Sequence, residues 1–523
     1  MRRRQGVITV YAGAAAVILI SVILAFVESA RFYVLETAAQ RYAAMAAEMT
    51  FSNYVRPLAD RYGIFVCPWR NDELSKMFSG YFEKNASDCG DSARLLNMYC
   101  SMEELSVSGE IAPDEDSWDY LAQQIVRAEK YALGETAAEG LMSFFGEDGT
   151  GSDLEEAANA SDELAGELAE EQENLEQESA GADPSDPADG GSGGAEAGSA
   201  GAAEAPDPRK GISRLLKSGF MGFIMGDKEI SAKTIDVSDC SYSVRKGSLL
   251  QLPDDFEDAG SAGSALEAEG EFWKSFLSEK EEDVLIDLYA FSNFSDMSGA
   301  KQSQEAADGG SVLQYETEYL IFGQSSDSRN LEYTMRALMA VRTGLNLVYL
   351  NQDAEKQVIV AEAASVIALA IMMPVAEELI RLLLNLCWAS AEALNDCSIL
   401  ASGGKVPVMK DSGSWALTFE GLMQLASTGE SPRGSSDGSR GLTYSQYLMI
   451  LVTAVSREKL VVRMTQLMEK NVRLSEGYEG FYFKNSCMGA GFSLAAGMDP
   501  LLAGTGGKVK RKMYTWFSYI TAK

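Results

Sequence analysis

The stretch GVITVYAGAAAVILISVILAFV (Gly6–Val27) decides the architecture of this 523-residue chain. It is uncharged over 22 residues, and about 20 residues are enough to cross the hydrocarbon core of a bilayer as a helix. Three arginines at positions 2–4 precede it, and Glu28 follows it. Because basic residues flank the N-terminal side, we expect residues 1–5 inside the cell and residues 28–523 outside it.

A cleaved secretory signal is the alternative interpretation of this stretch. The apolar core of such a signal is only about 7–15 residues long and ends at a small-x-small site. The run is longer here, and Glu28 would occupy the −3 position if cleavage followed Ala30. We therefore favour an uncleaved anchor. A second uncharged run, 363–376, contains Pro374 and is too short to span, so it predicts part of a buried pair of core helices.

The first helix is expected to continue beyond the membrane, because no proline precedes Pro57 and no glycine lies between Gly13 and Gly63. Residues 7–56 could form one rod, about 75 Å long. Apolar or small residues recur at intervals of three and four in its second half, for about two heptads. They form a candidate seam for a partner helix, which could equally pack on the chain's own globular part: Leu35, Ala38, Tyr42, Met45 and Met49.

Shifts in composition divide the chain into successive regions. We predict an α+β fold that is predominantly helical, with an N-terminal transmembrane helix extended as a rod and a mostly helical extracytoplasmic domain with a small antiparallel sheet. The predicted order is a cytoplasmic basic flank (1–5), a transmembrane helix (6–27), a juxtamembrane helix (28–62), a small cysteine-containing region (63–146), an acidic low-complexity spacer (147–210) and the C-terminal domain (211–523).

The acidic spacer accounts for much of the net charge of −33. Residues 147–207 contain 19 acidic residues and no Lys or Arg. The part from Asp153 to Glu178 is rich in Ala, Glu and Leu, which predicts a solvated helix. Residues 181–208 lack the large apolar side chains that offset ordering entropy, so we expect them to be disordered.

Local patterns predict the elements of the C-terminal domain. Alternation over residues 313–321, from Leu313 to Ile321, predicts a strand with one wet face. Further signals predict a helix from the N-cap Ser326 to about Leu350, helices at 354–373 and 375–397, and a helix from about Thr443 to Leu474 with Gln446 completing a capping box. The segments 480–483, 492–495 and 513–520 have β character, and the basic run 508–512 predicts a charged strand edge.

Composition also excludes several kinds of chemistry. The chain has no histidine, so Ser-His-Asp triads, Cys-His dyads and HExxH zinc helices are impossible. It has seven cysteines without a CxxC pair, which disfavours zinc ribbons and thioredoxin-like sites. Seven is odd, so at least one thiol is free or pairs between chains, and the pairing stays open among Cys67, Cys89, Cys100, Cys240, Cys387, Cys397 and Cys487.

Two short motifs come close to ligand-binding signatures and fail. The run Gly504–Lys508 resembles a phosphate loop, but Leu502 and Val509 stand where Gly and Ser or Thr are needed. An EF-hand loop beginning at Asp114 would need Gly at position 119, which is Asp119. We therefore predict no catalytic, cofactor or metal site, and the acidic charge disfavours nucleic acid as a partner.

The N-terminal segment Gly6-Val7-Ile8-Thr9-Val10-Tyr11, the apolar run and Glu28-Ser29-Ala30-Arg31 resemble the anchor of TadE/TadG-like proteins. These are pseudopilin-like components of tight-adherence (Flp) pilus systems. The chain also resembles a clostridial-type family of unknown function whose members are often encoded beside tight-adherence or type II secretion genes. That resemblance rests on Arg56–Phe65, Glu318–Gly323, Gly403–Pro407 and Gly441–Tyr444.

The resemblance implies a location and a neighbourhood, and no functional residues follow from it. Tyr11 would be the fifth residue after cleavage at Gly6, where processed prepilins usually carry Glu, so we expect the full-length anchor to persist. The sequence favours a non-enzymatic single-pass envelope protein with pilus or secretion subunits as partners and no defined oligomeric state. A stalked enzyme or sensor is the alternative, and a surface adhesin would expose an apolar patch away from the membrane.

Overall fold

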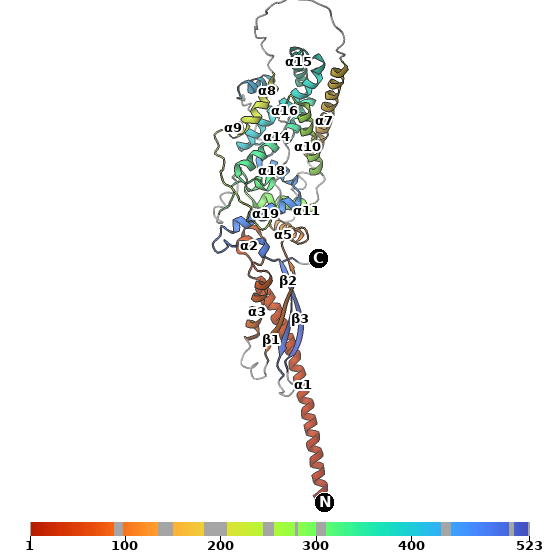
Figure 1. Ribbon diagram of the computed structural model, residues 1–523, viewed down its shortest axis with the longest axis vertical. Helices are drawn as coiled ribbons and strands as arrows, with labels where there is room; N and C mark the ends of the chain where they lie inside the picture. Colours follow the sequence, from red (N-terminus) through yellow and green to blue (C-terminus); the bar gives the residue numbers. More distant parts are fainter. Residues whose placement is uncertain are drawn as a thin grey trace, which may run out of the picture. The chain divides into compact units, whose positions relative to one another are not determined.

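The computed structural model describes residues 2–87, 98–133, 150–181, 207–243, 256–277, 281–299, 310–429, 441–500 and 507–520. This part of the chain is mostly helical and contains one three-stranded antiparallel sheet, which confirms the predicted fold class (Figure 1). The chain forms two compact units. Unit 1 consists of Met1–Ala128, Cys240–Tyr242 and Met468–Lys523, and unit 2 consists of Glu129–Asp239 and Ser243–Leu467.

Helix α1 (Arg2–Phe51) begins unit 1 and runs for 50 residues without a break (Figure 1). At 1.5 Å per residue its length is about 75 Å, as expected from the absence of proline and of late glycine. After a short turn, α2 (Arg56–Tyr62) starts with Pro57 in its first turn and ends at Gly63, whose φ of 65° suits a residue without Cβ. Helix α3 (Asn71–Ser87) follows and packs on α1.

The sheet of unit 1 joins two distant parts of the sequence. Its order is β1 (Cys100–Ile111), β2 (Gly489–Met498) and β3 (Val509–Ser518), with Cys100 opposite Met498 and Gly489 opposite Ser518. The residues of unit 2 are therefore inserted between two adjacent strands of one sheet. The division predicted along the sequence differs from this one, because strand pairing brings the end of the chain into the unit that α1 begins.

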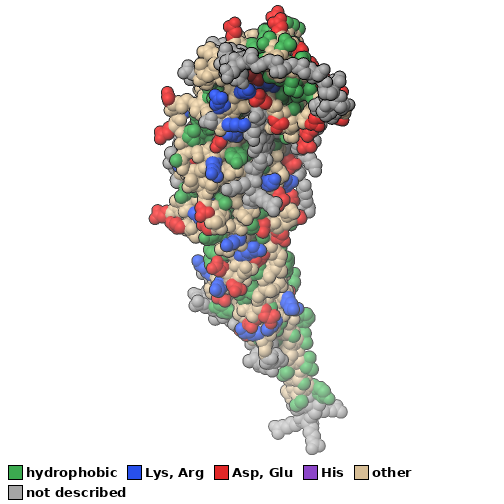
Figure 2. Space-filling view, turned by 45° about the horizontal axis from the view of Figure 1, so that its top comes forward, with side chains coloured by type: hydrophobic (Ala, Val, Ile, Leu, Met, Phe, Trp, Pro, Cys, Tyr) green, Lys and Arg blue, Asp and Glu red, His purple; other side chains and the backbone are tan. Residues whose placement is uncertain are grey.

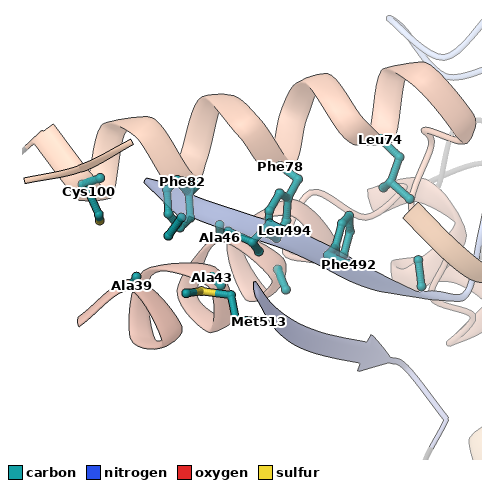
Figure 3. Close-up of a cluster of buried hydrophobic side chains, with 14 of the residues drawn as sticks. Ala39, Ala43, Ala46, Leu74, Phe78, Phe82, Cys100, Phe492, Leu494 and Met513 are labelled. Atoms are coloured by element: carbon teal, nitrogen blue, oxygen red, sulfur yellow. The ribbon is translucent and has the colours of Figure 1, made fainter. Parts of the chain in front are cut away.

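Alanines and aromatic rings fill the core between α1, α3 and the sheet (Figure 3). Phe78 of α3 stacks on Phe492 of β2 with 4.1 Å between ring centroids. Phe51, at the end of α1, stacks on Phe517 of β3 at 4.7 Å. Small α1 residues such as Ala43 allow the helix backbone to come close to these rings.

The predicted β segments 492–495 and 513–520 fall on β2 and β3, whereas 480–483 does not form a strand. Strand β3 is an edge strand that carries the basic run, and Lys510 Nζ lies 3.0 Å from Glu104 Oε1. Helix α5 (Asp119–Leu133) follows β1, and η2 (Phe483–Asn485) is a short 3₁₀ turn before β2.

The regular elements in the described part of unit 2 are all helices. At its centre α14 (Asp327–Gln352) packs on α16 (Glu377–Ala401), both largely buried. Around them lie α7 (Thr150–Gly181), α8 (Pro208–Ser218), α9 (Phe220–Met225), α10 (Ala259–Leu277), α11 (Glu281–Asn293), α13 (Glu316–Phe322), α15 (Ala354–Ala370), η1 (Pro374–Ala376), α17 (Phe419–Thr428), α18 (Tyr444–Thr453) and α19 (Arg457–Val472), the last of which ends within unit 1.

Several predicted helix boundaries are confirmed in unit 2. Ser326 caps α14 by accepting from the Arg329 N–H, and Thr443 and Gln446 form both bonds of a capping box. The predicted pair 354–373 and 375–397 corresponds to α15 and α16. The single helix predicted from Thr443 to Leu474 is wrong, because the chain breaks into α18 and α19 at residues 454–456.

The strand predicted for residues 313–321 is also wrong. These residues include α13, and all seven of its side chains are buried. The alternating glutamates suggested a solvent face, but both point into protein. Glu316 Oε2 accepts from the Ser295 N–H at 3.3 Å, and Glu318 Oε1 accepts from Tyr444 Oη at 2.7 Å.

The helix predicted in the acidic region lies within the described residues, whereas most of the segment predicted to be disordered does not. Helix α7 covers the predicted helix, but it is not solvated all round, since Ala158, Leu164 and Leu168 are buried and α7 packs on α10. The predicted disorder at 181–208 falls almost entirely on residues 182–206, which lie outside the described residues.

Candidate functional site

The first half of α1 exposes large apolar side chains on every side. Leu19, Phe26 and Ile8 are 63%, 72% and 67% exposed. Of the described helices, α1 is the one that is long and apolar enough to cross a membrane, with a window of mean hydropathy 2.6 in which no residue is buried. Figure 2 shows hydrophobic side chains covering this projecting segment. Such a surface is unfavourable in water and fits a hydrocarbon environment.

Two charged residues lie where the exposed apolar half of α1 ends and its packing on the rest of unit 1 begins. Arg31 binds Glu28 through two hydrogen bonds, Nη2 to Oε1 at 3.0 Å and Nε to Oε2 at 3.1 Å. Arg31 also donates to the backbone oxygen of Asp499, just after β2, and is only 6% exposed. The segment Glu28–Arg31 therefore fastens α1 to the sheet at the level where the apolar run stops.

The second half of α1 turns one face to the core of unit 1. Leu35, Ala39, Ala43, Ala47 and Phe51 are all at most 2% exposed. They recur every fourth residue, and Ala46 lies beside them. This buried side begins at Leu35, which also belongs to the predicted seam, and it continues through alanines that the seam does not include.

The five predicted seam residues do not share one environment. Leu35 is buried, Ala38, Tyr42 and Met49 are half-buried, and Met45 is 48% exposed. Tyr42 packs against the core cluster, and Asn85 Nδ2 lies 3.6 Å from Met49 Sδ. The structure thus packs Leu35 and Tyr42 on unit 1's own core and leaves Met45 exposed.

The same half of α1 also keeps large apolar side chains in solvent. Tyr33 is 74% exposed, Val34 is 49% exposed and Met45 is 48% exposed. We call Val34 and Met45 the outer α1 face. Val34 and Met45 are eleven residues apart, so they lie on the same side of the helix, about 16 Å apart along it. This face is available to a partner helix.

A buried ionic network lies between α14 and α16 in unit 2. Arg342 Nε is 3.0 Å from Asp396 Oδ2, and Lys410 Nζ is 2.7 Å both from Asp396 Oδ1 and from Glu392 Oε1. These four side chains are at most 1% exposed. Burial alone would lower the pKa of Arg342, but Tyr447 and Asp396 raise it.

The network holds the 406–417 segment against the two helices. Arg342 Nη1 donates to the backbone oxygens of Pro407 and Val408, at 2.9 and 2.7 Å. Glu392 accepts from the Leu417 N–H at 2.8 Å, and burial raises the pKa of Glu392 while Lys410 acts in the opposite direction. Because the charged atoms are buried and paired with one another, this cluster can hold the 406–417 segment in place but cannot contact a substrate.

A second buried cluster surrounds Glu318. Its carboxylate accepts from Tyr444 Oη at 2.7 Å and from the Met297 N–H at 2.9 Å. Burial, and then the charge of Asp296, raise the pKa of Glu318 to about 8. Burial therefore favours the neutral form of Glu318, whose side chain is fully buried. Perturbed carboxyls suggest catalysis when they line a cleft, and this one lies inside the core.

The helical hairpin of α15, η1 and α16 ends in an apolar tip. Leu369, Ile371, Met372, Met373 and Val375 are between 49% and 89% exposed. The sequence predicted that the run 363–376 is buried, and this is wrong for its second half. Helix α15 is rich in apolar residues, yet it buries one side only, through Val360, Ala364, Ile367 and Ala368. Its remaining apolar surface faces solvent.

The described residues contain no group of three or more Cys, Asp or Glu side chains arranged to hold a metal ion. Six of the seven cysteines lie in described segments. Cys387 and Cys397 are buried on α16, and burial raises the pKa of both thiols. Cys67 and Cys487 face each other in unit 1.

The comparisons with known proteins give one match. Residues 198–498, more than half of the chain, match the family of unknown function DUF5702. No curated protein and no solved structure shows significant similarity to the chain. The match covers most of unit 2 and reaches β2, and it carries no assigned activity.

Proposed function

Because this chain belongs to the DUF5702 family, whose function is unknown, we propose its role from its own architecture. It is a non-enzymatic, single-pass envelope protein, a pseudopilin-like or accessory component of a tight-adherence pilus or secretion system. Its N-terminus lies in the cytoplasm and the bulk of the chain lies outside. Its partners are the bilayer and the membrane-anchored subunits of that system, and nucleic acid is not among them.

The division of α1 carries this proposal. One continuous helix has a bare apolar first half and a second half that packs on its own antiparallel sheet. A subunit built in this way can stand in a membrane and present a rigid stalk to neighbouring helices. The outer α1 face directly continues the apolar half, which places it where other membrane-anchored helices would meet it. The resemblance of residues 6–31 to TadE/TadG-like anchors supports the same role.

The cytoplasmic placement of the N-terminus follows from the three arginines at positions 2–4. Protease added to intact, wall-stripped cells should digest the region after residue 28 and spare a tag on the N-terminus. Protection of the C-terminal region in unlysed cells, with digestion after lysis, would overturn this topology.

The proposed assembly is tested by gentle crosslinking of native membranes followed by purification of the full chain. We expect subunits of a pilus or secretion apparatus to co-purify, and their recovery should fall in a Met45→Asp variant. Recovery of the chain without such subunits, at a normal membrane level, would contradict the assignment.

The exposed apolar tip favours a second candidate role, attachment of unit 2 to an external surface. The tip places Leu369, Met372 and Val375 in solvent next to Glu377. Such an apolar patch on a folded protein usually indicates a binding surface. Cells carrying Leu369→Ser with Met372→Ser should adhere less, whereas Val358→Ser at the other end of α15 is the matched control. Unchanged adhesion would remove this candidate.

A further inference from the structure

We propose that Cys67 and Cys487 form a disulfide that joins the segment after α2 to the segment that enters β2. The proposal rests on the extracytoplasmic placement proposed above, because disulfides persist in oxidising compartments. Both residues lie in unit 1, and the whole of unit 2 lies between them in the sequence.

The backbone places the two cysteines opposite each other. They form an antiparallel bridge in which the Cys67 N–H donates to the Cys487 oxygen at 2.9 Å and the Cys487 N–H donates to the Cys67 oxygen at 3.0 Å. Residues paired in this way have Cα atoms about 5.5 Å apart. Disulfides join Cα atoms about 4.4–6.8 Å apart, so the bridge needs little backbone movement.

The two thiols also influence each other. The proximity of Cys487 lowers the pKa of Cys67, and the proximity of Cys67 together with burial raises that of Cys487. Both are completely buried, beside Thr50 and Trp69, whose backbone oxygens lie 4.0 Å from Cys67 Sγ and 3.3 Å from Cys487 Sγ. A bond formed here is shielded from reductants in solution.

The other described cysteines offer an internal contrast. Cys387 and Cys397 are ten residues apart on α16, which separates them by about 15 Å along the helix. Cysteines whose Cα atoms are more than about 7 Å apart cannot be bridged without backbone movement. These two thiols should stay reduced in the same molecule.

The oxidant is a disulfide of a thiol–disulfide exchange partner, small or protein. The Cys67 thiolate attacks one of its sulfurs, which forms a mixed disulfide and releases one thiolate. Cys487 then loses its proton and attacks the Cys67 sulfur, which forms the Cys67–Cys487 bond and releases the second thiolate. Two protons and two electrons pass from the cysteines to the oxidant. Because both thiols are buried in the folded protein, the oxidant must reach Cys67 before folding of unit 1 is complete.

The crosslink has a specific mechanical consequence. It closes a loop that contains α3, β1 and all of unit 2. Helix α1 and the β2–β3 hairpin therefore stay joined even when the residues between them open. In an anchored protein that bears load, the stalk remains attached to its sheet.

The test uses the full-length chain in native membranes, with free thiols alkylated after an acid quench. Trypsin digestion without reduction should release Tyr62–Arg70 linked to Asn485–Lys508, and each of these peptides contains one cysteine. The linked species should disappear on reduction, while Cys387 and Cys397 should already be alkylated. Complete alkylation of Cys67 and Cys487 would overturn the disulfide. The protease assay on intact cells tests separately whether residues 28–523 lie outside the cell. A failure of the disulfide proposal can therefore be distinguished from a failure of the proposed topology.

Thermal unfolding supplies an independent measurement. If the bond exists, Cys67→Ala, Cys487→Ala and the double variant should share one melting temperature, about 5 °C or more below the wild type. Reductant should lower the melting temperature of the wild type alone. Additive losses in the double variant, with no effect of reductant on the wild type, would contradict the proposal.

Discussion

The cores of unit 1 and unit 2 are held together by different interactions. In unit 1, α1 meets the sheet through alanines and phenylalanines, and every member of that cluster is apolar. In unit 2, α14 meets α16 through Arg342 and Asp396, both fully buried. Apolar contacts depend on shape, whereas buried charges depend on the presence of every partner. The two units should therefore fail under different perturbations.

We expect the largest effect from removing Asp396, whose carboxylate pairs with both Arg342 and Lys410. Asp396→Ala leaves two buried cations without this partner, and breaking a buried pair costs about 3–5 kcal/mol. Calorimetry should show the unfolding transition of unit 2 at a much lower temperature. The matched control is Glu332→Ala, whose partner Arg336 is partly exposed at 3.3 Å, with a loss below about 1 kcal/mol. Equal losses of stability in the two variants would contradict the proposed difference between buried and exposed ion pairs.

The next effect is a pH dependence that belongs to unit 2. Glu318 has a folded-state pKa of about 8, above its ordinary value of 4.5. The folded state therefore holds a proton that the unfolded state releases as pH rises from about 4.5 to 8. Stability from this group is present at low pH and is lost through that window, by up to about 1.4 kcal/mol per pH unit.

Glu318→Gln should remove this slope while keeping the shape of the side chain. We expect its unfolding free energy to vary less between pH 5 and pH 8 than that of the wild type, measured by denaturant titration. The transition of unit 1 provides the internal reference. An identical slope in the two proteins would show that Glu318 is ionised in the folded state.

A smaller effect tests the shape dependence of unit 1. Ala46→Leu adds three carbons where α1 meets the sheet, and overpacking of this kind costs about 1–3 kcal/mol. Ala44→Leu places the same side chain on the exposed side of α1 and should leave the melting temperature of unit 1 nearly unchanged. If Ala44→Leu destabilises unit 1 as much as Ala46→Leu, the assignment of Ala46 to the buried side of α1 and of Ala44 to the exposed side is wrong.

The same contrast explains which features could be predicted from the sequence. The apolar span, the uninterrupted α1, and the caps at Ser326 and Thr443 follow local rules, and the structure has each of them. The strand predicted at 313–321 failed because the rule assumes that polar residues face water. In unit 2 the carboxyl groups of Glu316 and Glu318 face inward, where Ser295 and Tyr444 donate hydrogen bonds to them.

Two other features could not be predicted because they depend on distant contacts. The pairing of β1 with β2 joins residues about 390 positions apart, so no local pattern indicates that the end of the chain belongs to unit 1. The buried side of α1 consists mainly of alanines, and their spacing alone does not show which side of the helix packs on the sheet. Met45 belonged to the predicted seam, and the structure leaves it exposed.

The smallest expected effect on stability concerns Met45. Because this side chain is 48% exposed, Met45→Asp should change the unfolding free energy of unit 1 by less than about 1 kcal/mol. Thermal unfolding of the purified chain measures this. A loss as large as that of Ala46→Leu would mean that Met45 packs inside the molecule.

The most direct test of the outer α1 face is a photocrosslinker placed at single positions in native membranes. Placed at Met45, it should capture a second membrane-anchored chain, and the product should be lost when Val34→Asp is introduced on the same face. Placed at Ala43, one of the buried positions, it should give only crosslinks within the molecule. Intermolecular products at neither position, with full-length chain present in the membrane, would contradict the proposal that α1 serves as an assembly surface.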